Sequence, residues 1–221
     1  MNAPTTGGNG RVAKRAETAL TPVKYLKFGT RLLEPHVYIT PYQGRPVVVK
    51  DYQRYQGTPL APAARLLVWR EARILRALSG WPHAPALLGS AGLLLGLELV
   101  SGMPLSETAP ESSPALLRQL GGIVARLHAG GVLHNDLHAS NLLVSAGTLV
   151  LLDYASAIRL PRWALRLPIV RELRRADLGN VLRIRRRLGG DTSPAPRALV
   201  RRGWVDAIQR NWKRWYAWAK S

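Results

Sequence analysis

The sequence predicts an α+β fold in two lobes, with a small β-rich lobe followed by an α-helical lobe. Short apolar runs bounded by turn residues dominate the first half of the chain, whereas longer segments with helical periodicity dominate the second half. The chain has 221 residues, of which 47% are hydrophobic. It is therefore long enough to bury a core within one bilobed domain.

The first half contains three runs typical of strands: Val23–Phe28, Val37–Thr40 and Pro46–Asp51. The segment Pro41–Arg45 joins the last two and predicts a hairpin turn. We expect a helix over Ala63–Leu78, whose apolar residues repeat at helical spacing, and core positions for Trp69 and Trp81. The apolar segment Leu93–Val100 is bounded by glycine and predicts a buried strand.

The second half begins with a helix predicted over Ala115–Ala129, because Ser113 is a good N-cap and Pro114 suits the first helical position. Val132–Val144 predicts a strand that runs into a loop, and Thr148–Leu152 predicts a short buried strand. Two further helices are expected, over Ile169–Leu188 and Pro196–Lys220.

The chain has a formal net charge of +19 and no cysteine. Without cysteine it has no disulfide scaffold, no cysteine-ligated zinc site and no thiol nucleophile. The positive charge is concentrated after Arg159 and attracts phosphates, nucleic acid or an anionic membrane surface. The most apolar segment, Ala84–Met103, is interrupted by glycine, proline and Glu98, so no membrane-spanning helix is expected. Because Met1–Arg15 lacks the apolar region of a secretory signal, we expect a cytoplasmic protein.

The densest group of polar residues is the segment His134–Asn141, which lies between two apolar runs. It contains Asp136 and Asn141, and Asp153 follows at the end of a short apolar strand. Carboxylate and carboxamide oxygens at the ends of buried strands suit a hard cation such as Mg2+. An aspartate five residues before an asparagine suits a base beside a metal ligand.

This arrangement resembles the H-x-D-x-x-x-x-N catalytic loop and the metal-binding aspartate of the protein-kinase superfamily. Three upstream segments resemble other landmarks of that superfamily. They are Val47–Lys50, similar to the strand with the phosphate-binding lysine, Arg70–Leu75, similar to the helix whose glutamate pairs with it, and Leu97–Gly102, similar to the adenine-binding hinge. Each match is weak alone, but four matches in the same order are a strong signal.

The resemblance implies ATP and Mg2+ as cofactors and gives roles to individual residues. Asp136 would accept the proton of the acceptor hydroxyl or orient that hydroxyl. Lys50, fixed by Glu71, would contact the α- and β-phosphates. Asn141 and Asp153 would hold Mg2+.

The resemblance also implies secondary roles. The backbone of Glu98 and Val100 would face adenine. His138 stands where many protein kinases carry lysine, whereas small-molecule and lipid-linked relatives often show Asp-Leu-His at this place. His134 is expected to be a structural anchor. Asp177 either braces the catalytic loop or lies on the surface among arginines.

The chain departs from the protein-kinase pattern in several places. The expected phosphate loop, Gly29–Pro35, has a single glycine, and the Arg31 side chain is a candidate replacement for its phosphate contacts. The D-F-G triplet appears as Asp153–Ala155, and the A-P-E motif is missing. The chain after Asp153 is too short for a full lower lobe. It therefore resembles the minimal atypical kinases, namely the RIO group and the bacterial lipopolysaccharide-core (Kdo/heptose) kinases, with a truncated helical lobe.

We expect four parts along the chain. They are a disordered leader at 1–15, a β-rich lobe at 16–102, a helical lobe at 103–198 and a basic tryptophan-rich helix at 199–221. In that last helix one face carries Trp204, Ile208, Trp212 and Trp215. Such a face suits either an anionic membrane surface or docking on the protein's own lobe.

The function implied by the resemblance is transfer of the γ-phosphate of ATP to a hydroxyl. The expected acceptor is a lipopolysaccharide-core sugar on a glycolipid, with the C-terminal helix at the inner face of the membrane. An atypical protein kinase of RIO type, acting on serine or threonine, is the alternative. The basic segment Arg183–Arg187 leaves open a nucleic-acid- or ribosome-associated protein. The incomplete phosphate loop leaves open a pseudokinase that serves as a binding module.

Overall fold

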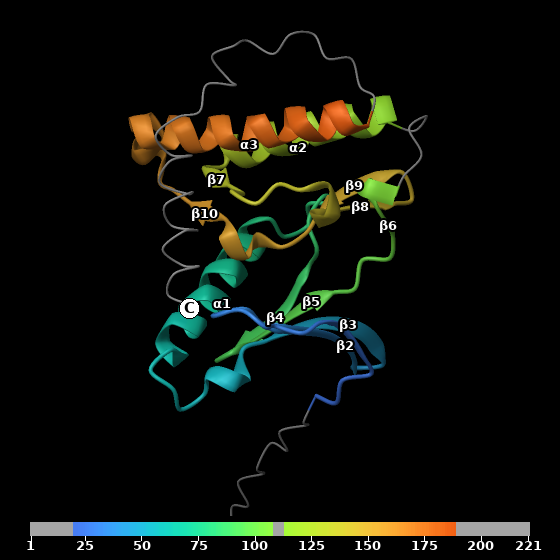
Figure 1. Cartoon of the computed structure of the whole chain (residues 1–221), viewed down its shortest axis with the longest axis vertical. Coiled ribbons are helices and arrows are strands. Elements are labelled where there is room, and N and C mark those ends of the chain that lie inside the picture. Colours follow the sequence, from blue (N-terminus) through green and yellow to red (C-terminus); the bar gives the residue numbers. More distant parts are fainter. Residues whose placement is uncertain (1–19, 108–112, 189–221) are drawn as a thin grey trace, which may run out of the picture.

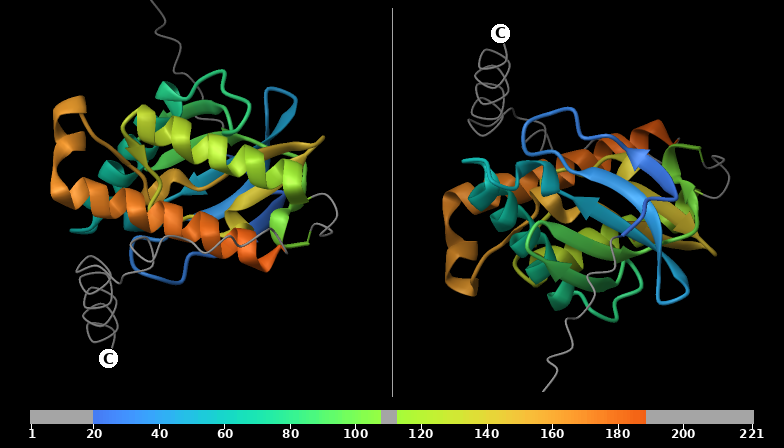
Figure 2. Two further views of the ribbon diagram at one scale, coloured as in Figure 1. Left: turned by 90° about the horizontal axis from the view of Figure 1, so that it is seen from above. Right: turned by 90° about the horizontal axis from the view of Figure 1, so that it is seen from below.

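The computed structural model describes residues 20–107 and 113–188, and within these ranges it confirms the predicted bilobed α+β fold (Figure 1). A five-stranded antiparallel sheet forms the β-rich lobe, and two long helices lie side by side in the other lobe (Figure 2). The predicted leader at 1–15 and tryptophan-rich helix at 199–221 lie outside the described residues. None of the helices within residues 20–107 and 113–188 has the length and apolar character of a transmembrane span.

The sheet has the strand order β1-β2-β3-β5-β4. Its strands are β1 (Lys24–Lys27), β2 (His36–Tyr42), β3 (Arg45–Asp51), β4 (Leu87–Ala91) and β5 (Leu94–Glu98). Between β2 and β3, Gln43 and Gly44 have φ angles of 50° and 76°. Positive φ at both central positions is typical of a two-residue type I′ turn, whose twist matches that of the strands. The turn is shorter than the predicted Pro41–Arg45 because both strands continue into it.

The strand predicted over Leu93–Val100 is the second arm of a hairpin that begins with β4. Gly92, with φ of 55°, lies in the short connection between β4 and β5. The prediction missed β4 because this edge strand exposes most of its residues and contains glycine, serine and alanine instead of β-branched residues.

Helix α1 (Ala61–Ala77) carries Pro62 in its first turn, where the missing N–H costs no helical hydrogen bond. Its inner face buries Ala64, Val68, Ala72 and Leu75. Trp81 is buried as predicted, but the prediction for Trp69 is wrong. Trp69 is 53% exposed because it follows Val68 on the outer face, where the guanidinium of Arg73 lies 5.3 Å from its ring centre.

The helical lobe contains α2 (Ser113–Ala129), α3 (Pro168–Arg187) and five short strands. Three strands form one small antiparallel sheet: β6 (Met103–Pro104), β8 (Leu142–Ser145) and β9 (Thr148–Leu151). The other two, β7 (Val132–Leu133) and β10 (Ile158–Arg159), pair with each other. The short 3-10 turns are η1 (Gln53–Tyr55), η2 (Leu105–Glu107), η4 (Ala139–Asn141), η5 (Tyr154–Ser156) and η6 (Arg162–Arg166). Because the predicted catalytic loop connects β7 to β8, strands fix both of its ends.

One apolar core runs through both lobes. It includes side chains from α1, β5, α2, η5 and α3: Ile74, Leu75, Leu95, Leu120, Leu127, Tyr154 and Val181. Burying a large apolar side chain stabilises a fold by about 1.5–3 kcal/mol. This continuous cluster therefore holds the two lobes together.

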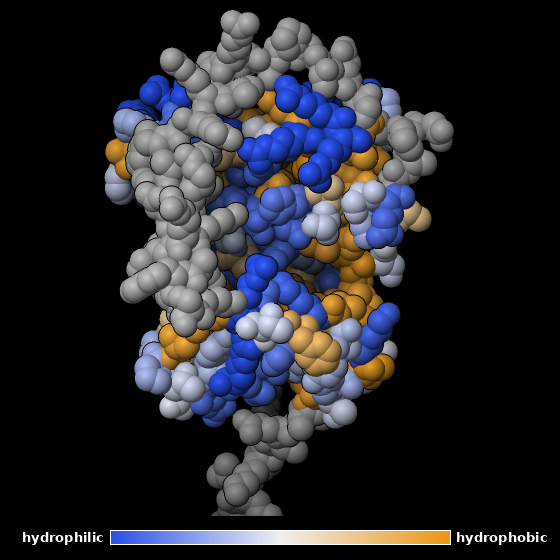
Figure 3. Space-filling model, viewed as in Figure 1, coloured by the Kyte–Doolittle hydropathy of each residue, from blue (hydrophilic) through white to orange (hydrophobic). Residues whose placement is uncertain are grey.

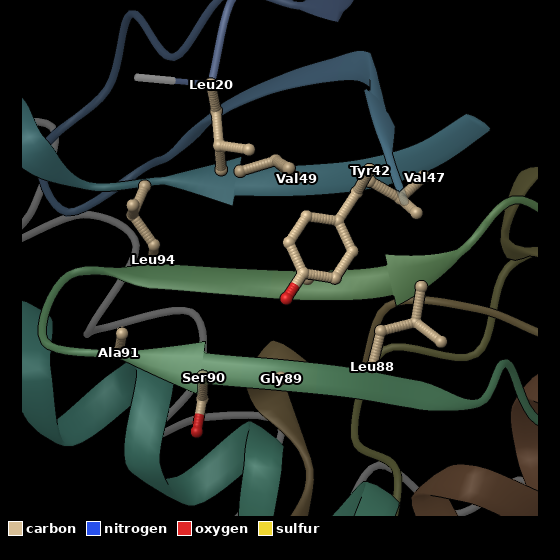
Figure 4. Close-up of a pocket in the computed structure, with 10 residues that line it drawn as sticks. Leu20, Tyr42, Val47, Val49, Leu88, Gly89, Ser90, Ala91 and Leu94 are labelled. Carbon is tan, nitrogen blue, oxygen red and sulfur yellow. The ribbon is translucent and has the colours of Figure 1, made fainter. Parts of the chain in front are cut away.

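A smaller apolar cluster of Tyr38, Val47 and Val49 lies on the other face of the sheet. Successive residues of a strand point to opposite faces, so this face is opposite to Lys50. An apolar groove of about 300 Å³ lies there, and Figure 4 shows Leu20 beside Val49 in it. Among the residues that the structure describes, none with a charged side chain lines the groove, which is separate from the polar centre described next.

Candidate active site

Three charged side chains from distant parts of the chain meet where the lobes join. Lys50 lies on β3, Glu71 lies on α1, and Asp153 follows β9. Lys50 Nζ is 2.7 Å from Glu71 Oε1 and 2.7 Å from Asp153 Oδ1. The structure therefore brings together three of the predicted site residues, of which Lys50 and Asp153 are 103 positions apart.

Burial and charge act on this cluster in opposite directions. Lys50 and Glu71 are 7% and 1% exposed. Burial alone would lower the pKa of Lys50, but the carboxylates of Glu71 and Asp153 raise it above its ordinary value. Burial alone would raise the pKa of Asp153, but the Lys50 ammonium lowers it below its ordinary value. Lys50 and Asp153 are therefore both charged at neutral pH, which suits a site for an anion and a cation.

The catalytic loop, residues 134–141, presents Asp136 and Asn141. Asn141 Nδ2 donates a hydrogen bond to the backbone carbonyl of Asp136 at 3.0 Å, which fixes the side-chain amide and leaves its oxygen as an acceptor. The Asp136 side chain is 42% exposed, and its Oδ1 lies 2.9 Å from Nε2 of His138. The loop therefore offers a carboxylate, a carboxamide and an imidazole close together.

Asp177 on α3 holds the start of the catalytic loop. Its buried carboxylate accepts hydrogen bonds from the backbone N–H groups of His134 and Asn135, both at 2.9 Å. His128 Nε2 lies 3.0 Å from the same carboxylate. Asn135 has φ of 62°, in the left-handed region that favours glycine, asparagine and aspartate. The sequence left open whether Asp177 braces the catalytic loop or lies on the surface, and these contacts show that it braces the loop.

His134 is fully buried and contacts the segment that follows β9. Its Nε2 lies 3.2 Å from the carbonyl oxygen of Leu152, and its ring packs edge-on against Tyr154 with centroids 5.1 Å apart. Burial lowers the pKa of His134 below its ordinary value, so the imidazole is neutral at pH 7. The N–H of Leu152 in turn donates to the carbonyl of Asn141 at 2.7 Å. These contacts agree with the predicted structural anchor.

The predicted phosphate loop, residues 29–35, is held by hydrogen bonds between its own backbone and one of its side chains. Glu34 Oε2 accepts hydrogen bonds from the N–H groups of Thr30 at 3.0 Å and Arg31 at 2.9 Å. Lys27 Nζ lies 2.6 Å from Glu34 Oε1. Burial opposes ionisation, but Lys27 and the two N–H groups lower the pKa of Glu34 to about 2. A carboxylate thus occupies the kind of backbone N–H groups that a glycine-rich loop offers to phosphates.

Arg54 closes the same loop by donating hydrogen bonds to the carbonyls of Gly29 and Arg31. A Cβ at Gly29 would clash with the carbonyl of Glu34, so only glycine fits there. Neither Glu34 nor Arg54 was predicted from the sequence as a residue that holds this loop. A signal for Glu34 exists, because a glutamate three residues after a backbone N–H is the spacing of a capping contact. The phosphate role of the Arg31 side chain stays a prediction.

The predicted hinge follows β5. The N–H of Glu98 donates to the carbonyl of Ala86 at 2.9 Å, and Glu98 Oε2 accepts from the N–H of Ala86 at 3.1 Å. The N–H of Glu98 is therefore engaged within the sheet. The adenine contacts of the remaining backbone groups of Glu98 and Val100 stay predictions.

Figure 3 shows that the surface where the lobes meet is hollowed and hydrophilic. Asp153 Oδ1 accepts from Lys50 and from the N–H of Ala155, whereas Oδ2 makes no hydrogen bond within the described ranges. Oδ2 and the amide oxygen of Asn141 are hard oxygen ligands. Mg2+ in proteins is commonly held by one or two carboxylates together with substrate phosphates, so the residues present fit a Mg2+–nucleotide complex.

Among curated proteins, the chain is similar to "EKC/KEOPS complex subunit BUD32" of Encephalitozoon cuniculi, with 42% identity over 78 residues, 34% of this chain and 39% of the relative. It is also similar to "Probable bifunctional tRNA threonylcarbamoyladenosine biosynthesis protein" of Methanothermobacter thermautotrophicus, with 28% identity over 127 residues, 55% of this chain and 23% of the relative. The chain thus spans less than half the length of these relatives. No family model matches it.

Among solved structures, the chain is similar to the Rio2 kinase from Chaetomium thermophilum in its ADP/Mg2+-phosphoaspartate complex. The TM-score is 0.61 and the identity 20%, over 79% of this chain and 59% of that one. A second structure of that Rio2 kinase gives a TM-score of 0.60 at the same identity, over 79% of this chain and 61% of that one. The predicted protein-kinase-like fold, in its RIO-like atypical form, is therefore confirmed.

Proposed function

We propose that this chain is an ATP- and Mg2+-dependent phosphotransferase of Bud32/RIO type whose acceptor is a hydroxyl group on a protein. The observation that carries the proposal is the meeting of Lys50, Glu71 and Asp153, with both Lys50 contacts at 2.7 Å, beside a loop that exposes Asp136. Phosphoryl transfer depends mainly on positioning and on charges fixed in advance around the transferring group.

Each side chain has a role that follows from its place. Lys50, held by Glu71, would contact the phosphates of the nucleotide. Asp153 and Asn141 would hold the metal ion through their free oxygens. Asp136, tied to Asn141 through its backbone carbonyl, would orient the acceptor hydroxyl. When bound, ATP supplies the phosphoryl group and Mg2+ supplies positive charge beside it. The ADP/Mg2+ complex of the Rio2 neighbour supports this choice of cofactors.

A protein acceptor is favoured over a lipopolysaccharide-core sugar. One structural neighbour is a Rio2 kinase, and one relative is a subunit of the EKC/KEOPS complex, which also supports protein partners. A glycolipid acceptor and a membrane-bound C-terminal helix draw no support from these relatives. The cytoplasmic location stays a prediction.

The test measures transfer and release of γ-labelled phosphate from ATP and Mg2+ by the purified chain. We expect Asp153→Asn to lower the rate at least about 100-fold, because it weakens the metal site. Asp51→Asn is the matched control. It makes the same chemical change one residue after Lys50, on the opposite face of β3, and should keep the rate. Equal slow rates in wild type and both variants would contradict the proposal.

The chemical stability of the product identifies the acceptor. Acid-stable label in protein indicates a serine or threonine ester. Label released by hydroxylamine indicates an acyl phosphate, as in the phosphoaspartate of the Rio2 complex. Label in a lipid–glycan fraction would replace the protein acceptor by a sugar.

A second candidate is a subunit of an RNA-modifying assembly that binds nucleotide without transferring phosphate. Glu34 already occupies loop N–H groups, which favours binding without catalysis. On α3, Glu172 pairs with Arg175 and Asp177 is buried, so the exposed arginines of the helix have no carboxylate from their own helix beside them: Arg171, Arg183, Arg186 and Arg187. Such a face suits RNA phosphates. Unchanged slow turnover in every variant, with RNA binding that weakens steeply with salt, would favour this candidate.

A further inference from the structure

Helix α1 meets the turn that begins at Asp153 through three neighbouring contacts. The Glu71 carboxylate shares the ammonium of one lysine with Asp153, at 2.7 Å from each. The N–H of Tyr154, the next residue of the turn, donates to the same Glu71 carboxylate. The carbonyl of Ala155, one residue further, accepts a hydrogen bond from Arg70 Nη2. Two adjacent residues of α1 therefore contact two consecutive residues of the turn, and Lys50 links Glu71 to the residue before them.

Arg70 is the member of this set that does not belong to the charged cluster itself. It is half-buried and links the β-rich lobe to the helical lobe through a backbone carbonyl. Its Nε is buried without a hydrogen-bond partner within the described part of the chain. An unpaired buried N–H lowers stability, so packing alone does not account for an arginine at this place.

The positions of Arg70 and Glu71 on the helix explain what the extra contact does. Adjacent helical residues point about 100° apart around the axis. The apolar face of α1 packs in the core, and Glu71 adds one polar contact on one side of the helix. A second contact at Arg70, in a different direction, fixes the rotation of the helix where the two lobes meet (Figure 1).

We propose that Arg70 is a positioning residue for phosphoryl transfer. Its bond to Ala155 fixes the rotation of α1, and this rotation keeps Glu71 paired with Lys50 and Lys50 within reach of Asp153. The proposal rests on the phosphotransferase function proposed above. Arg70 contacts neither nucleotide nor acceptor and acts through Glu71.

The test compares Arg70→Gln with Arg73→Gln, which removes the same charge on the outer face of α1, where Arg73 lies over Trp69. We expect Arg70→Gln to lower kcat/KM for ATP by roughly 10- to 100-fold, because small displacements of positioning groups have effects of this size. The loss should appear in kcat as well as in KM, and Arg73→Gln should change neither. Urea unfolding of both variants shows whether the protein stays folded.

A second readout does not depend on turnover. Hydrogen exchange of backbone amides in α1 and in residues 153–156 should be faster in Arg70→Gln than in Arg73→Gln, with the rest of the chain unchanged. If the wild type transfers no phosphate, the proposed function fails, but this exchange result still supports or overturns the helix-fixing role. Exchange equal in the two variants, or equal kcat/KM values in an active enzyme, would overturn the proposal.

Discussion

The two loops that the sequence assigns to the nucleotide site are held in opposite ways. In the catalytic loop, two backbone N–H groups donate to the buried Asp177, which is 42 and 43 positions away on α3. In the phosphate loop, two backbone N–H groups donate to Glu34, which is three and four positions away in the same loop. In both loops, one carboxylate accepts hydrogen bonds from two backbone N–H groups. In the catalytic loop that carboxylate comes from a distant helix, whereas in the phosphate loop it comes from the loop itself.

The difference indicates what each loop depends on. The catalytic loop keeps its shape only when α3 packs beneath it, so its geometry is coupled to the core. The phosphate loop carries its own carboxylate brace, to which Arg54 adds two contacts from 23 and 25 positions away, so its geometry depends mainly on a short stretch of sequence. A change at the tertiary brace should therefore affect the whole fold, whereas a change at the local brace should stay local.

The largest effect is expected from Asp177→Ala. It leaves the N–H groups of the buried His134 and the half-buried Asn135 without acceptors, at about 1–3 kcal/mol each. We expect the free energy of unfolding to fall by about 3 kcal/mol or more, measured by urea titration. Glu172→Gln on the same helix removes only an ion pair near the surface and should cost less than about 1 kcal/mol. Similar losses in both variants would show that Asp177 is not a brace.

The site residues that could be predicted from the sequence are those whose proposed role requires one particular chemical group. Lys50 and Asp153 need a fixed charge, and Asn141 needs a carboxamide, so their identities and spacing are visible in the sequence. Asp177 was visible only through resemblance, because a carboxylate among arginines is equally typical of a surface.

The parts that could not be predicted bind backbone groups. Arg70 and Arg54 donate to carbonyls, and every residue has a carbonyl, so nothing in the partner's sequence marks the contact. The phosphate loop is held by hydrogen bonds to its own Glu34, and it lacks the glycine pattern that would identify it in the sequence. Strand β4 was missed because it lies at an edge and has little apolar surface to create alternation.

A smaller effect is expected from Gly29→Ala in the phosphate loop. The added Cβ would lie 2.6 Å from the carbonyl oxygen of Pro35 and would also clash with that of Glu34. We expect a loss of about 1–3 kcal/mol in urea unfolding, because the backbone must shift to accept the methyl group. Gly121→Ala in α2 is the control, because its Cβ meets no atom within 4 Å, and it should stabilise the protein by about 0.5–1 kcal/mol. A Gly29→Ala variant as stable as the wild type would show that the loop is not closed as described.

The smallest effect concerns the pH dependence of the local brace. The pKa of Glu34 is lowered to about 2 in the folded state, below its value in the unfolded chain. A lowered folded-state pKa means that the contribution of Glu34 is fully present above the unfolded pKa and is lost as the pH falls through the folded one. Glu34→Gln should therefore be less stable than the wild type at pH 7, by less than about 1 kcal/mol, and the difference should shrink as the pH approaches 2. Melting temperatures of the two proteins across this range measure the difference, with Glu107→Gln at an exposed position of η2 as the control. A difference that stays constant with pH would show that the charge of Glu34 does not hold the loop. The loop would then depend on Arg54, which lies 23 and 25 positions away from its partners, and the contrast with the catalytic loop would be lost.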